Sequence, residues 1–357
     1  MKNKLRLFEA FRLLLSVFLA LALVAVIIFF VSDEPLVALS ALITGPIREF
    51  SRLGNVIEMA IPLSFTGLAV CVMFKANQFN MVTEGAFYIA AVVAAYVAIF
   101  FPLPPVILPL VAIVCGMLAG GLLGSVPAIL KIKTNSSVIV VSLMLNYVVA
   151  LLGRFLISNV MRDPSSGSGS SYAFQKIAKL PVLIPGTRIH FGFILMILAT
   201  VFVFTMVYRS KLGYGIRMTG LNGKFSQYAG IPVNRTILLS QIIGGGIAGI
   251  GGSVEMLGMY SRFSWVGTPG YGWDAIIISI LAKENPAFIP FSAFFLAYIR
   301  IGADIMAMTS DVPSEIVAIV QGVIILLLAA KQFLSKWRNK ILIENTLQRK
   351  KTLGGES

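Results

Sequence analysis

The chain contains a series of apolar runs separated by short polar or basic segments. A run of about 20 apolar residues is what an α-helix needs to cross the hydrocarbon core of a membrane. The runs lack the strict alternation of apolar and polar residues that marks transmembrane β-strands. Only 12% of the residues are charged and 57% are hydrophobic, whereas a soluble domain carries about 25% charged residues. The sequence therefore predicts an all-α, polytopic membrane protein.

Ten membrane-spanning helices fit the apolar runs and give a transmembrane domain at residues 11–330. They are about Phe11–Val31, Asn55–Phe74, Met81–Phe101, Val106–Leu130, Ser137–Ile157, Phe191–Tyr208, Thr236–Tyr260, Tyr271–Ala282, Ala287–Ile305 and Pro313–Ala330. The seventh span is rich in glycine, which is typical of membrane helices that pack closely. The segment Ser32–Gly54 has mixed charge and is expected on the outer side of the membrane.

The basic N-terminus with its following apolar run also resembles a signal peptide. Leu13–Val31 is longer than a typical hydrophobic region of a signal peptide, and no cleavage site of small residues follows closely. We interpret this run as an uncleaved first span, with a cleaved signal peptide as the alternative.

Basic residues indicate the orientation of the chain. They cluster in residues 1–10, in the tail at residues 331–357, and after the fourth and sixth spans, and an excess of Lys and Arg is typical of cytoplasmic segments. An even number of spans also returns the C-terminus to the side of the N-terminus. Both termini are therefore expected in the cytoplasm, and the polar loop at residues 159–190 outside. The net charge of +14 then reflects topology and contact with lipid headgroups, not nucleic-acid binding.

The segment at residues 209–235 is a basic island between two apolar runs and holds no Asp or Glu. Its position and charge predict a cytoplasmic loop. Several glycines divide it into short pieces, of which Lys224–Ala229 is long enough for one short helix with Asn222 as its N-cap. The placement of Lys75–Asn80 stays open between a cytoplasmic turn and a break inside the membrane.

Two carboxylates stand at the starts of apolar runs. Glu84 opens the third span and Asp274 opens the eighth, each beside glycine and aromatic residues. Carboxylates inside a membrane are costly and are functional candidates, and broken helices in two halves of a chain point to a transport site. The alternative is that both acids cap helices and fix packing, and that Asn146 in the fifth span is an interhelical hydrogen-bonding residue.

The basic island also carries an ordered motif. It reads Gly215-Ile216-Arg217, Gly220-Leu221-Asn222, Tyr228-Ala229-Gly230-Ile231 and then Arg235. This order resembles the coupling loop of ABC transporter permeases of the type II importer family, in its simple sugar and nucleoside branch. The resemblance implies that the loop docks on an ATPase through Arg217, Gly220, Asn222, Tyr228, Gly230 and Ile231. The family usually has two small residues shortly before the tyrosine, where this chain has Phe225 and Ser226.

Further matches to the same family cover roughly Ala60 to Ala330. They are Phe79-Asn80 with Glu84-Gly85, Gly270-Tyr271-Gly272-Trp273-Asp274, Leu143-Met144-Leu145-Asn146-Tyr147, and Val312-Pro313-Ser314-Glu315 with Gln321-Gly322. By this resemblance the substrate pathway is expected to involve Asn80, Glu84, Asn146, Tyr271, Trp273 and Asp274. The family often has an acid before the third of these motifs, where this chain has Ser136 and Ser137.

The resemblance implies a permease subunit that forms half of a translocation pathway in the cell membrane. Its expected partners are a separate ABC ATPase, a second permease that is identical or paralogous, and an extracytoplasmic substrate-binding lipoprotein. Aromatic rings and amides suit an uncharged nucleoside, and a simple sugar is the alternative. The chain itself is not expected to hydrolyse ATP, because no phosphate-binding motif is complete: Leu221 and Phe225 stand where Lys and Ser or Thr are needed.

The sequence leaves two other classes of function as alternatives. A proton- or sodium-coupled secondary transporter would use Glu84 or Asp274 and would need no ATPase. An intramembrane enzyme would need a catalytic set, and none is evident in the sequence. A metal site is not expected either, because the chain has a single histidine, His190, and its two cysteines, Cys71 and Cys115, lie in apolar runs.

Overall fold

The computed structural model describes residues 22–165, 170–313, 316, 319 and 321–323. Two compact units divide the chain: a main unit of Thr44–Ile301, and a terminal unit of Met1–Ile43 with Gly302–Ser357. The described residues form helices and no β-strand beyond two isolated bridges. The helices are Ala22–Val31, α2 (Pro35–Arg48), α3 (Phe50–Lys75), α4 (Thr83–Phe100), α5 (Ile107–Thr134), α6 (Val138–Asn159), α7 (Gly192–Arg209), α8 (Lys211–Leu221), α9 (Gly223–Tyr228), α10 (Val233–Met259), α11 (Tyr271–Leu281) and α12 (Ile289–Thr309), with short 3₁₀ turns at Lys176–Ala178 and Pro286–Phe288.

Seven of these helices are long and apolar enough to cross a membrane. They are α3, α4, α5, α6, α7, α10, and α12 with its preceding turn, and each lies within a few residues of a predicted span. The helix Tyr271–Leu281, which the sequence analysis counted as the eighth span, is too short to cross a membrane alone. The first and tenth predicted spans fall largely outside the described residues, so the count of ten stays a prediction.

The segment Ser32–Gly54, for which the sequence analysis predicted no helix, is largely helical. It holds α2 and the first turn of α3, because Pro35 starts a helix well and the mixed charges that follow do not break one. In the terminal unit, the Asp311 carboxylate accepts hydrogen bonds from Ser32 Oγ at 2.5 Å and from the Asp33 amide at 2.7 Å.

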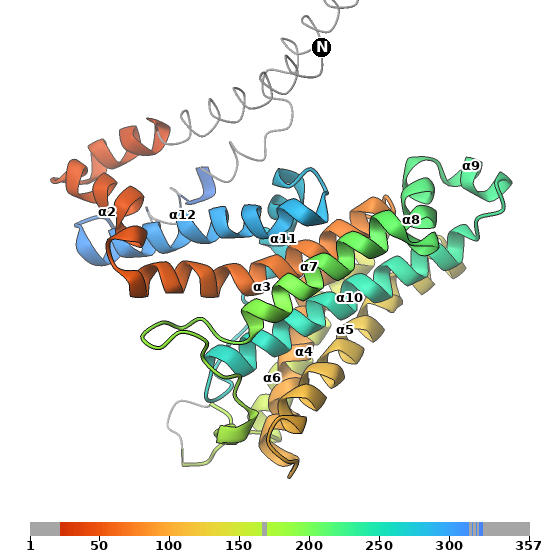
Figure 1. Ribbon diagram of the computed structural model, residues 1–357, viewed down its shortest axis with the longest axis horizontal. Coiled ribbons are helices and arrows are strands. Elements are labelled where there is room, and N and C mark those ends of the chain that lie inside the picture. Colours follow the sequence, from red (N-terminus) through yellow and green to blue (C-terminus); the bar gives the residue numbers. More distant parts are fainter. Residues whose placement is uncertain (1–21, 166–169, 314–315, 317–318, 320, 324–357) are drawn as a thin grey trace, which may run out of the picture. The chain divides into compact units, whose positions relative to one another are not determined.

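Helix α3 forms the centre of the main unit. In its most apolar stretch 89% of the residues are buried, compared with 72% for α4 and for α10, and 22% for α6. A helix that is apolar all round belongs in the interior, so α3 is enclosed by the others. Figure 1 shows α4, α5 and α10 side by side, with α8 and α9 at the end of the bundle where α10 begins.

Glycines bring α5 and α10 into close contact, as the glycine-rich sequence of the seventh predicted span indicated. A Cβ on Gly120 would collide with the Gly245 carbonyl oxygen, and one on Gly249 would collide with the Gly116 carbonyl oxygen. Packing without intervening side chains is a main way for helices to associate in lipid. The face of α10 that carries these glycines therefore determines where α5 packs.

Candidate functional site

Glu84 connects the starts of two helices inside the main unit. It lies in the first turn of α4, and its carboxylate accepts hydrogen bonds from the Gly270 amide at 2.7 Å and the Gly272 amide at 2.5 Å. These amides belong to the N-terminus of α11, where backbone N–H groups lack partners within the helix. The side chain is 2% exposed. The carboxylate thus caps α11, which favours the helix-capping alternative for this residue.

Glycine is required at both positions whose amides donate to Glu84. Gly270 has a φ of +88°, a conformation that L-residues rarely adopt. A Cβ on Gly272 would collide with the backbone of Glu84. The Gly-Tyr-Gly motif therefore starts α11 and leaves room for the acid.

Two asparagines fix the turn that precedes α4. Asn146 of α6 accepts a hydrogen bond from the Gly85 amide at 3.0 Å and donates to the Met81 carbonyl at 2.8 Å. Asn80 accepts from the Val82 amide at 2.9 Å and donates to Gln241 of α10. Both asparagines are buried. Their contacts are interhelical, as the alternative interpretation of Asn146 predicted, and a role in the substrate pathway stays a prediction.

Asp274 pairs with a residue that sequence analysis missed. Arg300 of α12 places its Nη2 atom 2.7 Å from Oδ1 and 2.6 Å from Oδ2 of Asp274. The Asp274 side chain is 7% exposed and that of Arg300 is 23% exposed. A lone arginine within the span predicted at Ala287–Ile305 was the available signal, because an intramembrane cation needs a partner.

Aromatic side chains gather around residues 260–270, between α10 and α11. Trp265 stacks on Phe87 with ring centroids 6.0 Å apart and on Tyr88 at 6.4 Å, and Tyr271 meets Phe87 edge-on at 5.3 Å. Tyr88 is fully buried, whereas Trp273 is 48% exposed. Trp265 was not predicted, because it lies among turn residues outside any apolar run. Trp273 is the most exposed of the six residues predicted for the substrate pathway.

The loop at residues 159–190 packs on this region. The Ser171 amide donates to the Phe263 carbonyl at 3.1 Å, and the Phe263 amide donates to Ser171 Oγ at 2.9 Å. Asp163 forms an ion pair with Arg262 at 2.5 Å. Hydrogen bonds from Ser165, followed by the contact with Arg262, lower the pKa of Asp163. These contacts connect the polar loop to the segment that leads into α11.

His190 at the end of this loop is expected to make the main unit sensitive to acid. The ring is fully buried beside Gly192 and Gly258, and burial lowers its pKa from 6.5 to about 4. Because the folded state resists protonation, the unfolded state gains protons first, and stability is expected to fall as pH drops from 6.5 towards 4. The expected loss is about 2 kcal/mol at pH 5 relative to pH 7.5. Thermal unfolding of wild type and His190→Gln across this range measures it, and an equal slope in both proteins would contradict the assignment.

The segment 209–235 contains two helices where one was predicted. The short helix α9 forms as predicted, and Asn222 Oδ1 accepts the Phe225 amide at 3.0 Å as its N-cap. The helix α8 was not expected, because its glycines were interpreted as breaks. They instead allow close approach: a Cβ on Gly213 would collide with the Met206 carbonyl oxygen, and one on Gly220 with that of Lys75.

The predicted coupling residues divide between two environments. Arg217 lies over the Tyr208 ring of α7 at 5.4 Å, and Gly220 lies against Lys75 at the end of α3, so both residues fix α8 to these helices. Tyr228 is 92% exposed and Leu221 is 81% exposed, and Gly230 has a φ of +77°. The contact between Lys75 and Gly220 also places Lys75–Asn80 at the same end of the bundle as α8.

The cap of α9 gives a local prediction. Asn222→Ala removes the acceptor for the Phe225 amide and is expected to cost about 1 kcal/mol within this short helix. Amide hydrogen exchange over residues 223–228 should then speed up by about fivefold. Gln227→Ala is the matched control, because Gln227 is exposed in the same helix and is not its cap. Equal exchange in the two variants would contradict a stabilising cap.

Spanning helices around a buried centre, with a short helix capped inside the bundle, define a multi-pass membrane protein. The chain belongs to the family described as the permease component of the branched-chain amino acid transport system, which matches residues 52–329. This match confirms the resemblance found in the sequence. The chain is a permease subunit of an ABC transporter and lies in the cell membrane.

Three relatives match along most of their length. The guanosine ABC transporter permease protein NupP of Bacillus subtilis is 32% identical, over 89% of this chain and 92% of the relative. The glucose ABC transporter permease protein TsgB13 of Haloferax volcanii is 28% identical, over 91% and 88% respectively. The nucleoside ABC transporter permease protein NupB of Lactococcus lactis subsp. cremoris is 28% identical, over 89% and 90%.

Proposed function

We propose that this permease forms half of an import pathway for a nucleoside and is driven by a separate ATPase that docks on residues 209–235. The proposal places both termini and this segment in the cytoplasm, and the loop at residues 159–190 outside. ATP hydrolysis then belongs to the partner, and this chain contributes the pathway and the coupling surface.

The exposed helix α9 is the observation that carries the coupling role. Phe225 and Tyr228 of α9 are 56% and 92% exposed, and Leu221, the last residue of α8, is 81% exposed beside them. A cluster of exposed apolar and aromatic side chains within a basic segment suits a groove on a protein partner. The helix α8 behind them is fixed to α3 and α7, so a force on α9 is transmitted to the membrane helices.

The nucleoside assignment rests on the relatives and on the aromatic residues. Two of the three relatives described above are named for guanosine or nucleosides. The half-exposed Trp273 and the stacked ring of Trp265 offer π surfaces, which favour a base over a simple sugar. A simple sugar is the second candidate, because the glucose permease relative matches over a similar length.

A second permease and a substrate-binding lipoprotein complete the proposed importer. Lactococcus lactis and Haloferax volcanii each have two permeases that resemble this chain. That pairing supports a paralogous second subunit. The secondary-transporter alternative is not favoured, because Glu84 and Asp274 are both occupied by hydrogen bonds or an ion pair.

Purification of the complex from gently solubilised membranes tests the coupling surface. An ABC ATPase identified by mass spectrometry should co-purify with wild type, and Tyr228→Ala with Gly230→Val should remove it. Tyr214→Ala is the matched control, because Tyr214 is 53% exposed on α8 outside the proposed docking helix. An ATPase that stays bound to the Tyr228 and Gly230 variant would overturn this docking site.

Uptake by the assembled importer tests the substrate class. Radiolabelled guanosine should accumulate and be displaced by other nucleosides, and excess glucose should have no effect. Glucose uptake that nucleosides leave unchanged would replace the nucleoside assignment with the sugar.

A further inference from the structure

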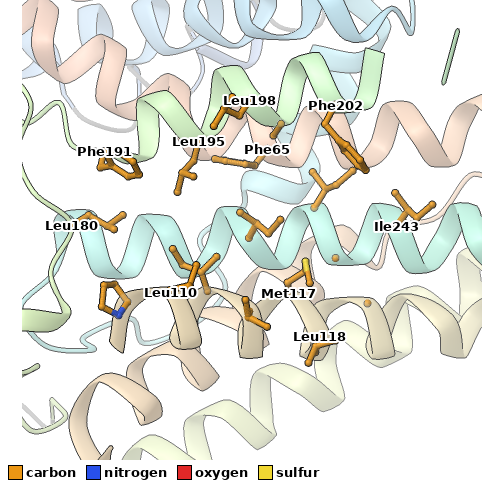
Figure 2. Close-up of a pocket in the computed structure, with 18 of the residues that line it drawn as sticks. Phe65, Leu110, Met117, Leu118, Leu180, Phe191, Leu195, Leu198, Phe202 and Ile243 are labelled. Atoms are coloured by element: carbon orange, nitrogen blue, oxygen red, sulfur yellow. The ribbon is translucent and has the colours of Figure 1, made fainter. Parts of the chain in front are cut away.

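An apolar groove runs along the surface of the main unit between α5 and α7. Its volume is about 1120 Å³. Figure 2 shows Leu195, Leu198 and Phe202 of α7 on one side of it and side chains of α5, among them Leu110, Met117 and Leu118, on the other. Ile243 of α10 and Phe65 of α3 lie between the two walls. The groove therefore opens where these helices face the hydrocarbon of the membrane.

Small residues leave the floor of this groove open. Gly121 of α5 and Gly246 of α10 both line it, and a Cβ on Gly246 would lie 3.5 Å from Met117. No side chain from either position projects into the space. The rim residues Leu110, Leu118 and Leu198 are 61%, 57% and 59% exposed. A membrane-facing hollow of this kind is filled by hydrocarbon, because water finds no polar partners there.

Both the length and the charge of the groove fit a phospholipid. On α7 the lining extends from Phe191 to Phe202, about 17 Å at 1.5 Å per residue, and one leaflet of the hydrocarbon core is about 15 Å thick. Lys179 lines the end of the groove next to the loop at residues 159–190, and it is the one charged residue in the lining. It is exposed and gives this end of the groove a positive charge, which suits a headgroup phosphate.

We propose that this groove binds one anionic phospholipid of the leaflet next to the loop at residues 159–190. An acyl chain lies between α5 and α7 over Gly121 and Gly246, and the phosphate contacts Lys179. The bound lipid fills the space between α7 and the helices α5 and α10, which have few direct contacts with α7. The assignment of this leaflet to the extracytoplasmic side rests on the proposed function. The groove and Lys179 are features of the structure and do not depend on that function.

Native mass spectrometry of the purified full chain with defined lipids tests the site. We expect dioleoylphosphatidylglycerol to remain bound, and dioleoylphosphatidylcholine to dissociate more readily. Lys179→Gln should lower phosphatidylglycerol retention about fivefold, with Lys176→Gln as the matched control, because Lys176 is exposed nearby and does not line the groove. Ala199→Trp fills the groove from α7 and should abolish retention. Its control is Ile197→Trp, at a position 45% exposed on the same helix outside the groove.

Three results would overturn the proposal: equal retention of the two lipids, no effect of Lys179→Gln beyond that of Lys176→Gln, or full retention by Ala199→Trp. Lys179→Gln changes an exposed side chain, so it reports on the site even where the tryptophan variant fails to fold. The measurement needs no ATPase, substrate or lipoprotein. Loss of the lipid site and failure of the nucleoside import proposal are therefore separate outcomes.

Discussion

Glu84→Ala is expected to destabilise the main unit and to abolish transport. The Gly270 and Gly272 amides would lose their acceptor in a buried site, and each unsatisfied buried amide costs about 1–3 kcal/mol. The expected loss is therefore about 2–6 kcal/mol, and α11 would no longer be fixed to α4. Thermal unfolding in detergent should show a lower midpoint, by about 5 °C or more. Uptake in the assembled importer should fall to background.

Glu84→Gln separates capping from proton transfer. The amide keeps one oxygen that accepts from a glycine amide, so a capping role predicts intermediate stability and intermediate uptake. A proton-carrying role predicts wild-type stability with no uptake, because glutamine cannot titrate. Wild-type unfolding and uptake in Glu84→Ala would contradict both roles.

The local features of this fold could be predicted from the sequence. Long apolar runs set the ends of α3 to α7 and of α10, because helix length in a membrane is fixed by its thickness. Asn222 as the cap of α9 followed from nearby residues alone. The start of α11 followed from Gly270, since glycine tolerates the positive φ that the turn needs.

The interactions between distant residues could not be predicted in the same way. Arg300 and Asp274 belong to different helices, and although an arginine within a span calls for a partner, the sequence does not show that Asp274 is that partner. Glycines in α8 were interpreted as helix breaks, although they serve close contact with Lys75 and α7. Single-sequence patterns describe one helix at a time, whereas both features depend on which helix lies alongside.

For the site, the sequence named segments whose part in a substrate pathway stays a prediction, and it did not show which contacts their residues make. Glu84, Asn80 and Asn146 lie together around the start of α4, although motif matching had placed Asn146 in a separate motif of the fifth span. Their contacts are with backbone and neighbouring helices, so the capping alternative describes the geometry best. Trp265 was missed because an aromatic residue in a glycine- and proline-containing turn gives no periodic signal.

The ion pair between Asp274 and Arg300 gives the second large expected effect. Asp274→Ala leaves the Arg300 guanidinium without its carboxylate in a largely buried site, and breaking a buried pair from one side costs about 3–5 kcal/mol. Asp274→Asn should cost less, because its oxygen still accepts a hydrogen bond from Nη2. Thermal unfolding of the single variants measures both losses, and a wild-type midpoint in Asp274→Ala would contradict an energetically important pair.

A double variant then decides whether this pair is structural or mechanistic. Asp274→Leu with Arg300→Met replaces both charges by apolar side chains and should recover most of the stability, because neither charge is left alone. If uptake recovers with stability, the pair serves to fix α11 against α12. If the double variant is stable but does not transport, a charge at this position is needed for the substrate pathway, as the sequence motif predicted. The pair acts as a unit in either case, so the double variant should be more stable than the sum of the single losses implies.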